Sequence, residues 1–166
     1  SSIDEASKIN NFLRITDNLF IGNMNCIKNE RRLCKLNIEY LIDMTNLRPD
    51  DLNRKILGKI PCLCKRQQHS RLYLSVEIND TSFKSLFTAF NEVNKFIQRA
   101  KKTTTNKSIY NNNNNNNNDN VSCEEKRVLI FGKELLAPQV ICACAQYLMV
   151  EYEMNIETAL HIIMQK

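Results

Sequence analysis

The chain has 166 residues, of which 43% are hydrophobic and 25% charged, a composition that suits one compact domain with a real core. Its net charge of +5 comes from 23 basic and 18 acidic residues in short scattered clusters. No basic run alternates with aromatic residues and no apolar run reaches the ~18 residues of a membrane span, so neither nucleic acid nor membrane is expected as a partner. We therefore expect a single domain over residues 1–166.

Cysteine usage indicates a reducing compartment. The chain has seven cysteines, an odd number, and no secretory signal at its start, so we expect free thiols and a cytoplasmic or nuclear protein. The Cys-x-Cys pairs at 62–64 and 142–144 lack the two-residue spacer by which two thiolates usually reach one metal, and His69 and His161 add no ordered ligand spacing. No metal and no cofactor are therefore expected.

The first half of the chain predicts a hairpin, a helix and two further strands. Residues 12–15 and 19–21 form apolar runs joined by a polar trio at 16–18, as in a β-hairpin. From about Asn25 to Leu36, apolar residues recur at helical spacing. Strands are predicted at 38–44 and 73–78, and the stretch 48–70 between them is interpreted as an insertion.

The second half predicts three helices around one buried strand. Asp80 and the two residues after it offer capping oxygens ahead of a long amphipathic helix. The tract 103–122, with eight consecutive asparagines at 111–118, has nothing to bury and predicts a disordered loop. An apolar strand at 127–131, a helix from Pro138 or Gln139 to Tyr152, and a helix from Ile156 capped by Asn155 complete the chain. The order predicts an α/β fold with a central mixed, largely parallel sheet flanked by helices.

Several segments resemble dual-specificity protein phosphatases. Residues 15–22, Ile-Thr-Asp-Asn-Leu-Phe-Ile-Gly, look like the family's opening pattern Ile-x-x-x-Leu-Tyr-Leu-Gly, and residues 38–45 are similar to its next strand. Residues 73–80 resemble the strand that delivers the general-acid aspartate. Phe96-Ile97, Tyr147-Leu148-Met149 and residues 156–160 match family helices. The resemblance spans 12–166, interrupted by 48–70 and the asparagine tract, and the order and spacing of the pieces carry it.

The resemblance implies a phosphate-binding loop, His-Cys-x-x-Gly-x-x-Arg-Ser, after the apolar strand. In the family the Cys thiolate attacks phosphorus and the Arg grips the phosphate through two hydrogen bonds. Here Phe131 stands at the His position and Gly132 at the Cys position, and the Arg position falls on Pro138, or on Gln139 if the loop has one extra residue. The loop between them consists of Lys133, Glu134, Leu135, Leu136 and Ala137.

None of the loop residues replaces the missing chemistry. Lys133 carries a point charge without the planar fork of arginine, and Glu134 would repel a phosphate by roughly 1 to 4 kcal/mol, depending on the local dielectric. Asp80 keeps the position of the general acid, but without a nucleophile it has nothing to assist, and we expect it to cap the following helix. Cys142 and Cys144 lie within an apolar helix, where we expect buried, unreactive thiols.

These residues predict a catalytically inactive phosphatase-like domain, a pseudophosphatase that acts by protein binding. The resemblance implies a role in phospho-signalling and a phosphoprotein or kinase as partner, although the missing arginine favours an interface independent of phosphate. Two alternatives stay open: an active tyrosine or serine/threonine phosphatase with a non-standard site, and an unrelated α/β protein-interaction module. A homodimer through the aliphatic residues Leu135 and Leu136 is a further hypothesis.

Overall fold

The computed structural model describes residues 12–47, 57–64, 68–112 and 126–165. They form a six-stranded sheet in the order β1-β2-β6-β3-β5-β4. The strands are β1 (Phe12–Arg14), β2 (Leu19–Asn23), β3 (Ile38–Asp43), β4 (Leu57–Pro61), β5 (Ser70–Ser75) and β6 (Arg127–Gly132). The four central strands are parallel to one another, and the edge strands β1 and β4 are antiparallel to their neighbours. The mixed, largely parallel sheet predicted from the sequence is therefore confirmed.

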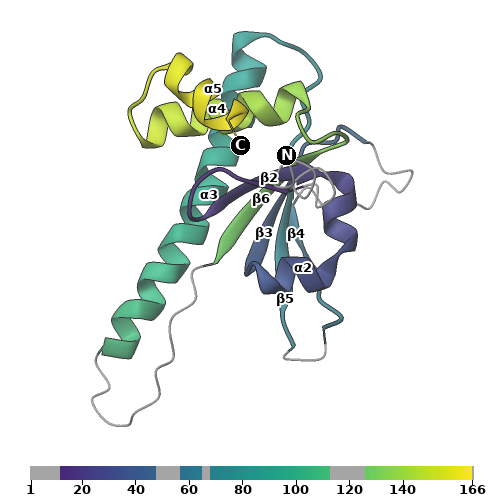
Figure 1. Ribbon diagram of the computed structural model, residues 1–166, viewed down its shortest axis with the longest axis vertical. Coiled ribbons are helices and arrows are strands. Elements are labelled where there is room, and N and C mark those ends of the chain that lie inside the picture. The colour runs from purple at the N-terminus through teal and green to yellow at the C-terminus, as the bar shows by residue number, and fades with distance from the viewer. Residues whose placement is uncertain (1–11, 48–56, 65–67, 113–125, 166) are drawn as a thin grey trace.

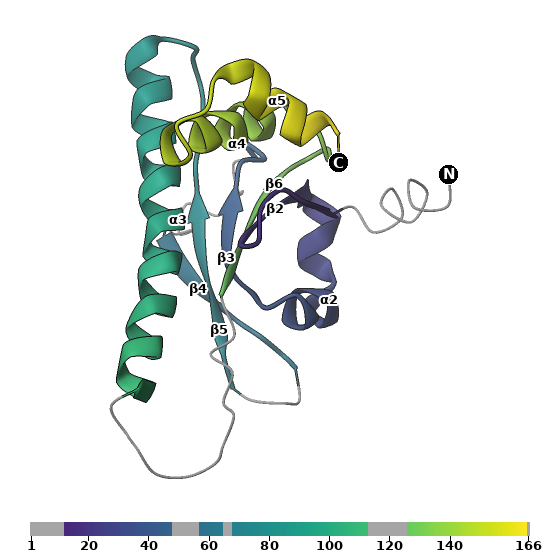
Figure 2. The ribbon, with the colours of Figure 1, turned by 60° about the vertical axis from the view of Figure 1, so that its left-hand side comes forward.

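Helices cover both faces of the sheet (Figures 1 and 2). The helices α3 (Phe83–Asn112), α4 (Pro138–Glu151) and α5 (Ile156–Met164) lie on one face, and the short helices η1 (Met24–Lys28) and α2 (Glu30–Lys35) lie on the other. Because side chains alternate along a strand, β6 sends Val128 and Ile130 into the larger core and Leu129 and Phe131 into the smaller one. Burial on both faces explains why this strand is apolar without alternation.

The predicted hairpin is confirmed as β1 and β2, but the predicted helix after it is interrupted. The chain forms η1 and then α2, and Asn29 separates them. The side chain of Asn29 accepts a hydrogen bond from the backbone N–H of Arg32 at 3.1 Å, so it caps α2 and starts a new helix. The helical spacing of the apolar residues does not reveal this break.

The range 48–70, interpreted as an insertion, contains an element of the sheet. Residues 57–61 form the edge strand β4, which pairs with β5 from Leu57 opposite Leu74 to Pro61 opposite Ser70. A proline is tolerated there because an edge strand bonds to a neighbour on one side only. Strand β5 itself lies three residues earlier than the predicted 73–78. Residues 48–56 and 65–67 lie outside the described residues.

The long helix α3 extends further than predicted. It continues through residues 103–112, the first part of the tract predicted as a disordered loop, and 113–122 lie outside the described residues. A helix nucleated on a core adds one hydrogen bond per residue, so it can continue into weakly helical sequence. The predicted α4 and α5 are confirmed, with Asn155 accepting from the N–H of Thr158 at 2.8 Å. Among the described helices, none is both long and apolar enough to cross a membrane.

Candidate functional site

The predicted phosphate-loop residues lie at the carboxyl ends of the parallel strands. Strands β3, β5 and β6 run in the same direction, so the segments that follow them emerge at one edge of the sheet. There the N–H of Met44 donates to the carbonyl of Phe131 at 2.9 Å. The geometry therefore places the loop after β6, the end of β3 and the Asp80 segment at the edge where α/β proteins bind ligands.

Gly132, which the sequence resemblance aligns with the nucleophile, has no room for a side chain. A Cβ built on this residue would lie 2.9 Å from the Cβ of Ala137 and 3.0 Å from a methyl group of Val140, distances that real Cβ atoms rarely or never show. Both of these side chains are buried, so neither has free space to retreat into. The space that a catalytic cysteine would need is filled by the start of α4.

The loop itself folds back as a turn. The N–H of Ala137 donates to the carbonyl of Glu134 at 3.3 Å, and the carbonyl of Ala137 accepts from Val140 at 3.0 Å. Lys133 and Glu134 are exposed. Leu135 packs partly buried against the larger core, whereas Leu136 is exposed.

The two candidate arginine positions are engaged in structural roles. Pro138 is the first residue of α4, where its missing N–H costs little. The side-chain amide of Gln139 donates to the carbonyl of Met44 at 3.0 Å, so it joins the start of α4 to the end of β3. Neither side chain offers a charge to a bound anion.

Asp80 is arranged as a hydrogen-bond acceptor at the start of α3. Its carboxylate accepts from the N–H of Ser82 at 2.8 Å and from the hydroxyl of Ser85 at 2.9 Å. Hydrogen bonds from Ser82, and then from Ser85, lower the pKa of Asp80 below its ordinary value. A general acid must hold a proton near neutral pH, which requires a raised pKa. The helix cap itself is Ser82, whose hydroxyl accepts from the N–H of Ser85 at 3.3 Å, so Asp80 supports the cap rather than forming it, and its environment opposes a role as an acid.

The two cysteines of α4 differ from each other. Cys144 is buried in the larger core, and burial raises its pKa to about 12, so it stays a protonated thiol. Cys142 is exposed, contrary to the prediction that both are buried, because residues two apart on a helix lie on different faces.

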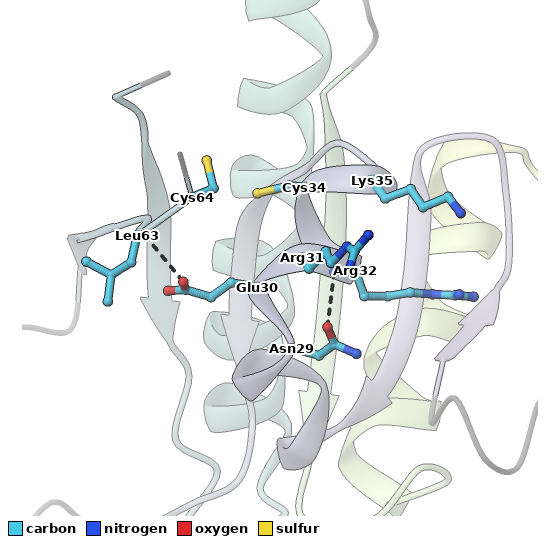
Figure 3. Close-up of a pocket in the computed structure, with 8 residues that line it drawn as sticks. All are labelled: Asn29, Glu30, Arg31, Arg32, Cys34, Lys35, Leu63 and Cys64. Carbon is cyan, nitrogen blue, oxygen red and sulfur yellow. Dashed lines mark hydrogen bonds between the residues drawn. The ribbon is translucent and has the colours of Figure 1, made fainter. Parts of the chain in front are cut away.

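A second group of residues, which the sequence spacing did not identify, lies at the amino ends of the parallel strands β3 and β5. The ligand atoms of Cys34, Cys62, Cys64 and His69 all lie within 4.8 Å of one another, although Cys34 comes from α2 and the others from the connection between β4 and β5. Beside them lies a cavity of about 920 Å³, whose wall includes Arg31 as well as Cys34 and Cys64 (Figure 3). The spacing of Cys62 and Cys64 was visible in the sequence, but the contribution of Cys34 was not.

The comparisons with known proteins identify the fold. No protein-family model and no curated protein matches the chain. Among solved structures, DUSP15 superposes with a TM-score of 0.62 and 14% identity over 95% of this chain and 76% of that one. The human tyrosine phosphatase-like serine/threonine/tyrosine-interacting protein superposes with a TM-score of 0.58 and 16% identity, over 93% of this chain and 83% of that one. The Cydia pomonella PTP-2 phosphatase superposes with a TM-score of 0.56 and 15% identity, over 95% of this chain and 80% of that one.

These likenesses show that the chain has the fold of dual-specificity phosphatases, as the sequence resemblance implied. The loop after β6 lies directly after a central strand of the sheet.

Proposed function

We propose that this chain is a catalytically inactive phosphatase-like domain that acts by binding a protein partner without recognising phosphate. The observation that carries the proposal is the closed space at Gly132, where Ala137 and Val140 occupy the place of a nucleophilic side chain. The hydrogen bonds that hold Asp80 in its ionised form support it independently, because they oppose a role for Asp80 as a general acid.

Exposed apolar side chains at the same edge support a protein interface. Leu47, Phe83 and Leu136 follow β3, β5 and β6, and they are 42%, 84% and 41% exposed. Phe83 stacks on Phe87 at 6.0 Å between ring centroids, and Phe87 is also 62% exposed. Exposed aromatic pairs are typical of surfaces that bind other proteins. One structural neighbour is named as a tyrosine phosphatase-like serine/threonine/tyrosine-interacting protein, and this name supports a binding role for the same fold.

An assay with p-nitrophenyl phosphate tests the inactive state. We expect no turnover above the buffer rate from the wild-type chain, and the same result from Asp80→Ala. Turnover that Asp80→Ala abolishes would contradict the proposal and support the alternative of an active phosphatase with a non-standard site.

Affinity capture tests the phosphate-independent interface. We expect the same bound proteins from a lysate before and after phosphatase treatment, and loss of those proteins with Phe83→Ser and Phe87→Ser together. Val150→Ser is the matched control, because Val150 is an exposed apolar residue near the opposite end of α4 from the loop. Binding that disappears on phosphatase treatment would instead indicate recognition of a phosphoprotein.

A further inference from the structure

Three thiols and one imidazole converge where α2 meets the connection between β4 and β5. The Sγ atoms of Cys34 and Cys62 are 3.5 Å apart, and the Nε2 atom of His69 lies 3.6 Å from Cys34 Sγ and 3.0 Å from Cys64 Sγ. In a tetrahedral zinc site, bonds of about 2.3 Å to sulfur and 2.0 Å to nitrogen place neighbouring ligand atoms about 3.5–3.8 Å apart. Two of these pairs therefore already have the spacing of a zinc site, and all four ligand atoms lie within 4.8 Å of one another.

The Cys-x-Cys spacing is compatible with this geometry, although the two cysteines lie directly after the end of β4. The sulfurs of Cys62 and Cys64 both lie in the cluster, while Leu63 between them is 82% exposed. The N–H of Cys64 also donates to Cys62 Sγ at 3.4 Å. A backbone N–H directed at a sulfur stabilises the thiolate that a metal requires. The expectation of no metal considered each cysteine pair by itself and did not include Cys34.

The residues around the cluster also prepare it for a cation. Glu39 of β3 places a carboxylate oxygen 3.1 Å from Nδ1 of His69, which assigns the proton to Nδ1 and directs the lone pair of Nε2 at the sulfurs. The buried Arg71 donates to Cys34 Sγ at 2.9 Å and to the carbonyl of Ile38 at 2.8 Å. Three thiolates around one divalent cation leave one negative charge, which the guanidinium of Arg71 balances.

We infer that Cys34, Cys62, Cys64 and His69 bind one Zn²⁺ ion in a structural site. Three sulfurs and one imidazole nitrogen favour zinc over magnesium, calcium or manganese, which prefer oxygen ligands. Four protein ligands fill a tetrahedral coordination sphere, so no position is left for water or substrate. The role of the metal is therefore mechanical rather than catalytic.

The metal would join α2 to the connection between β4 and β5. Cys34 lies on α2 and extends toward the segment that carries Leu63 and Cys64 across the cavity described above (Figure 3). Glu30 of α2 accepts from the N–H of Leu63 at 3.3 Å, which is the hydrogen bond drawn between the two walls. Zinc binding would thus fix the hairpin of β4 and β5 against α2. The site lies at the amino ends of β3 and β5, whereas the loop after β6 lies at the carboxyl ends of the parallel strands. The inference is therefore independent of the proposed function.

Metal analysis of the full chain, purified under reducing conditions without added zinc, tests the inference. We expect about one zinc per chain by mass spectrometry of the metal content, and less than a tenth of that in Cys34→Ser and in His69→Ala. Replacement of zinc by Co²⁺ should produce the thiolate charge-transfer and visible bands of tetrahedral coordination. The matched control is Cys142→Ser, which removes an exposed cysteine outside the cluster and should keep the metal and the spectrum.

Chelation of the wild-type protein removes the concern that a variant simply fails to fold. A strong zinc chelator should lower the thermal midpoint of the wild type and of Cys142→Ser, and added Zn²⁺ should restore it. Folded, reduced wild-type protein that neither contains zinc nor gives the Co²⁺ spectrum would overturn the inference. So would zinc that Cys34→Ser retains in full, or a Cys34–Cys62 disulfide in freshly purified protein, since a disulfide uses two of the four ligands.

Discussion

At Gly132 the structure leaves no room for a side chain larger than a hydrogen atom. We expect Gly132→Ala to lower the free energy of unfolding by about 1–3 kcal/mol, because the added methyl group overpacks against Ala137 and Val140. Urea denaturation measures this change. Gly132→Cys should be destabilised in the same way and should not acquire phosphatase activity.

The matched variant for this prediction is Ala137→Gly. It removes the Cβ atom that lies 2.9 Å from the built Cβ of residue 132, so the double variant should recover part of the stability lost in Gly132→Ala. A double-mutant cycle then gives a favourable coupling between two residues five apart in the chain. A Gly132→Ala variant as stable as the wild type would contradict the closed geometry.

Asp80 predicts a pH dependence of stability with a definite sign. Its folded-state pKa is lowered from the ordinary 3.8, so its contribution is complete above that pH and is lost as the pH falls through the folded-state value. We therefore expect the wild type to unfold at a higher urea concentration than Asp80→Ala at neutral pH, and the two midpoints to converge in acid. Because Asp80 is exposed, added salt should reduce the difference. A difference that grows as the pH falls would mean that Asp80 is protonated in the folded protein.

At the scale of elements, a pair of side-chain amides joins α3 to α4 on the face of the sheet that α3, α4 and α5 cover. The side chains of Asn94 and Gln146 bond reciprocally, at 2.9 Å and 2.6 Å. Removing one partner leaves the other, half-buried amide without its hydrogen bonds to that partner. Asn94→Ala and Gln146→Ala should therefore each lower the free energy of unfolding by about 1–3 kcal/mol.

The same pair tests whether the two helices are coupled through these amides. The double variant should cost less than the sum of the single variants, because no unpaired amide remains. Thermal unfolding of the four proteins measures the cycle. Strictly additive costs would show that water replaces the lost partner and that the pair contributes little to the packing of α3 on α4.

Elements with a strong local pattern were predicted well, and elements defined by pairing were not. The apolar run of β6 and the capped start of α5 are visible in consecutive residues, so their bounds were close to those observed. Strand β4 has no pattern of its own and exists because β5 pairs with it. The break between η1 and α2 depends on one cap, Asn29, within an otherwise helical pattern.

At the scale of the whole molecule, thiol labelling separates local exposure from global unfolding. Cys26 and Cys144 are buried, and burial is the main cause that raises their pKa values to about 11 and about 12, so both should react only when the whole domain opens. Cys142 is exposed and should react at once.

Peptide mass spectrometry after timed alkylation reads each site separately. Rates at Cys26 and Cys144 should rise together with denaturant and follow the global stability, while the rate at Cys142 should change little. Fast native labelling of Cys144 would contradict the burial of α4 against the sheet.

The homodimer through Leu135 and Leu136 remains a prediction, to which Leu136 offers the more exposed side chain. Leu136 is exposed, whereas Leu135 is committed in part to the core of its own chain. Sedimentation at rising protein concentration tests it: a dimer that Leu136→Ser dissociates supports this interface, and a monomer at high concentration removes it.

The amino-acid sequence by itself determined the fold class and the position of the loop after β6, and it predicted which residues stand at the positions of the phosphatase motif. These depend on local periodicity and on residue identity at aligned positions, both of which can be read along the chain. Only the tertiary structure decided that Ala137 and Val140 close the space over Gly132, and that Cys34 lies beside Cys62, Cys64 and His69. Those contacts join segments brought together by a turn or by strand pairing, and no local spacing encodes the resulting distances.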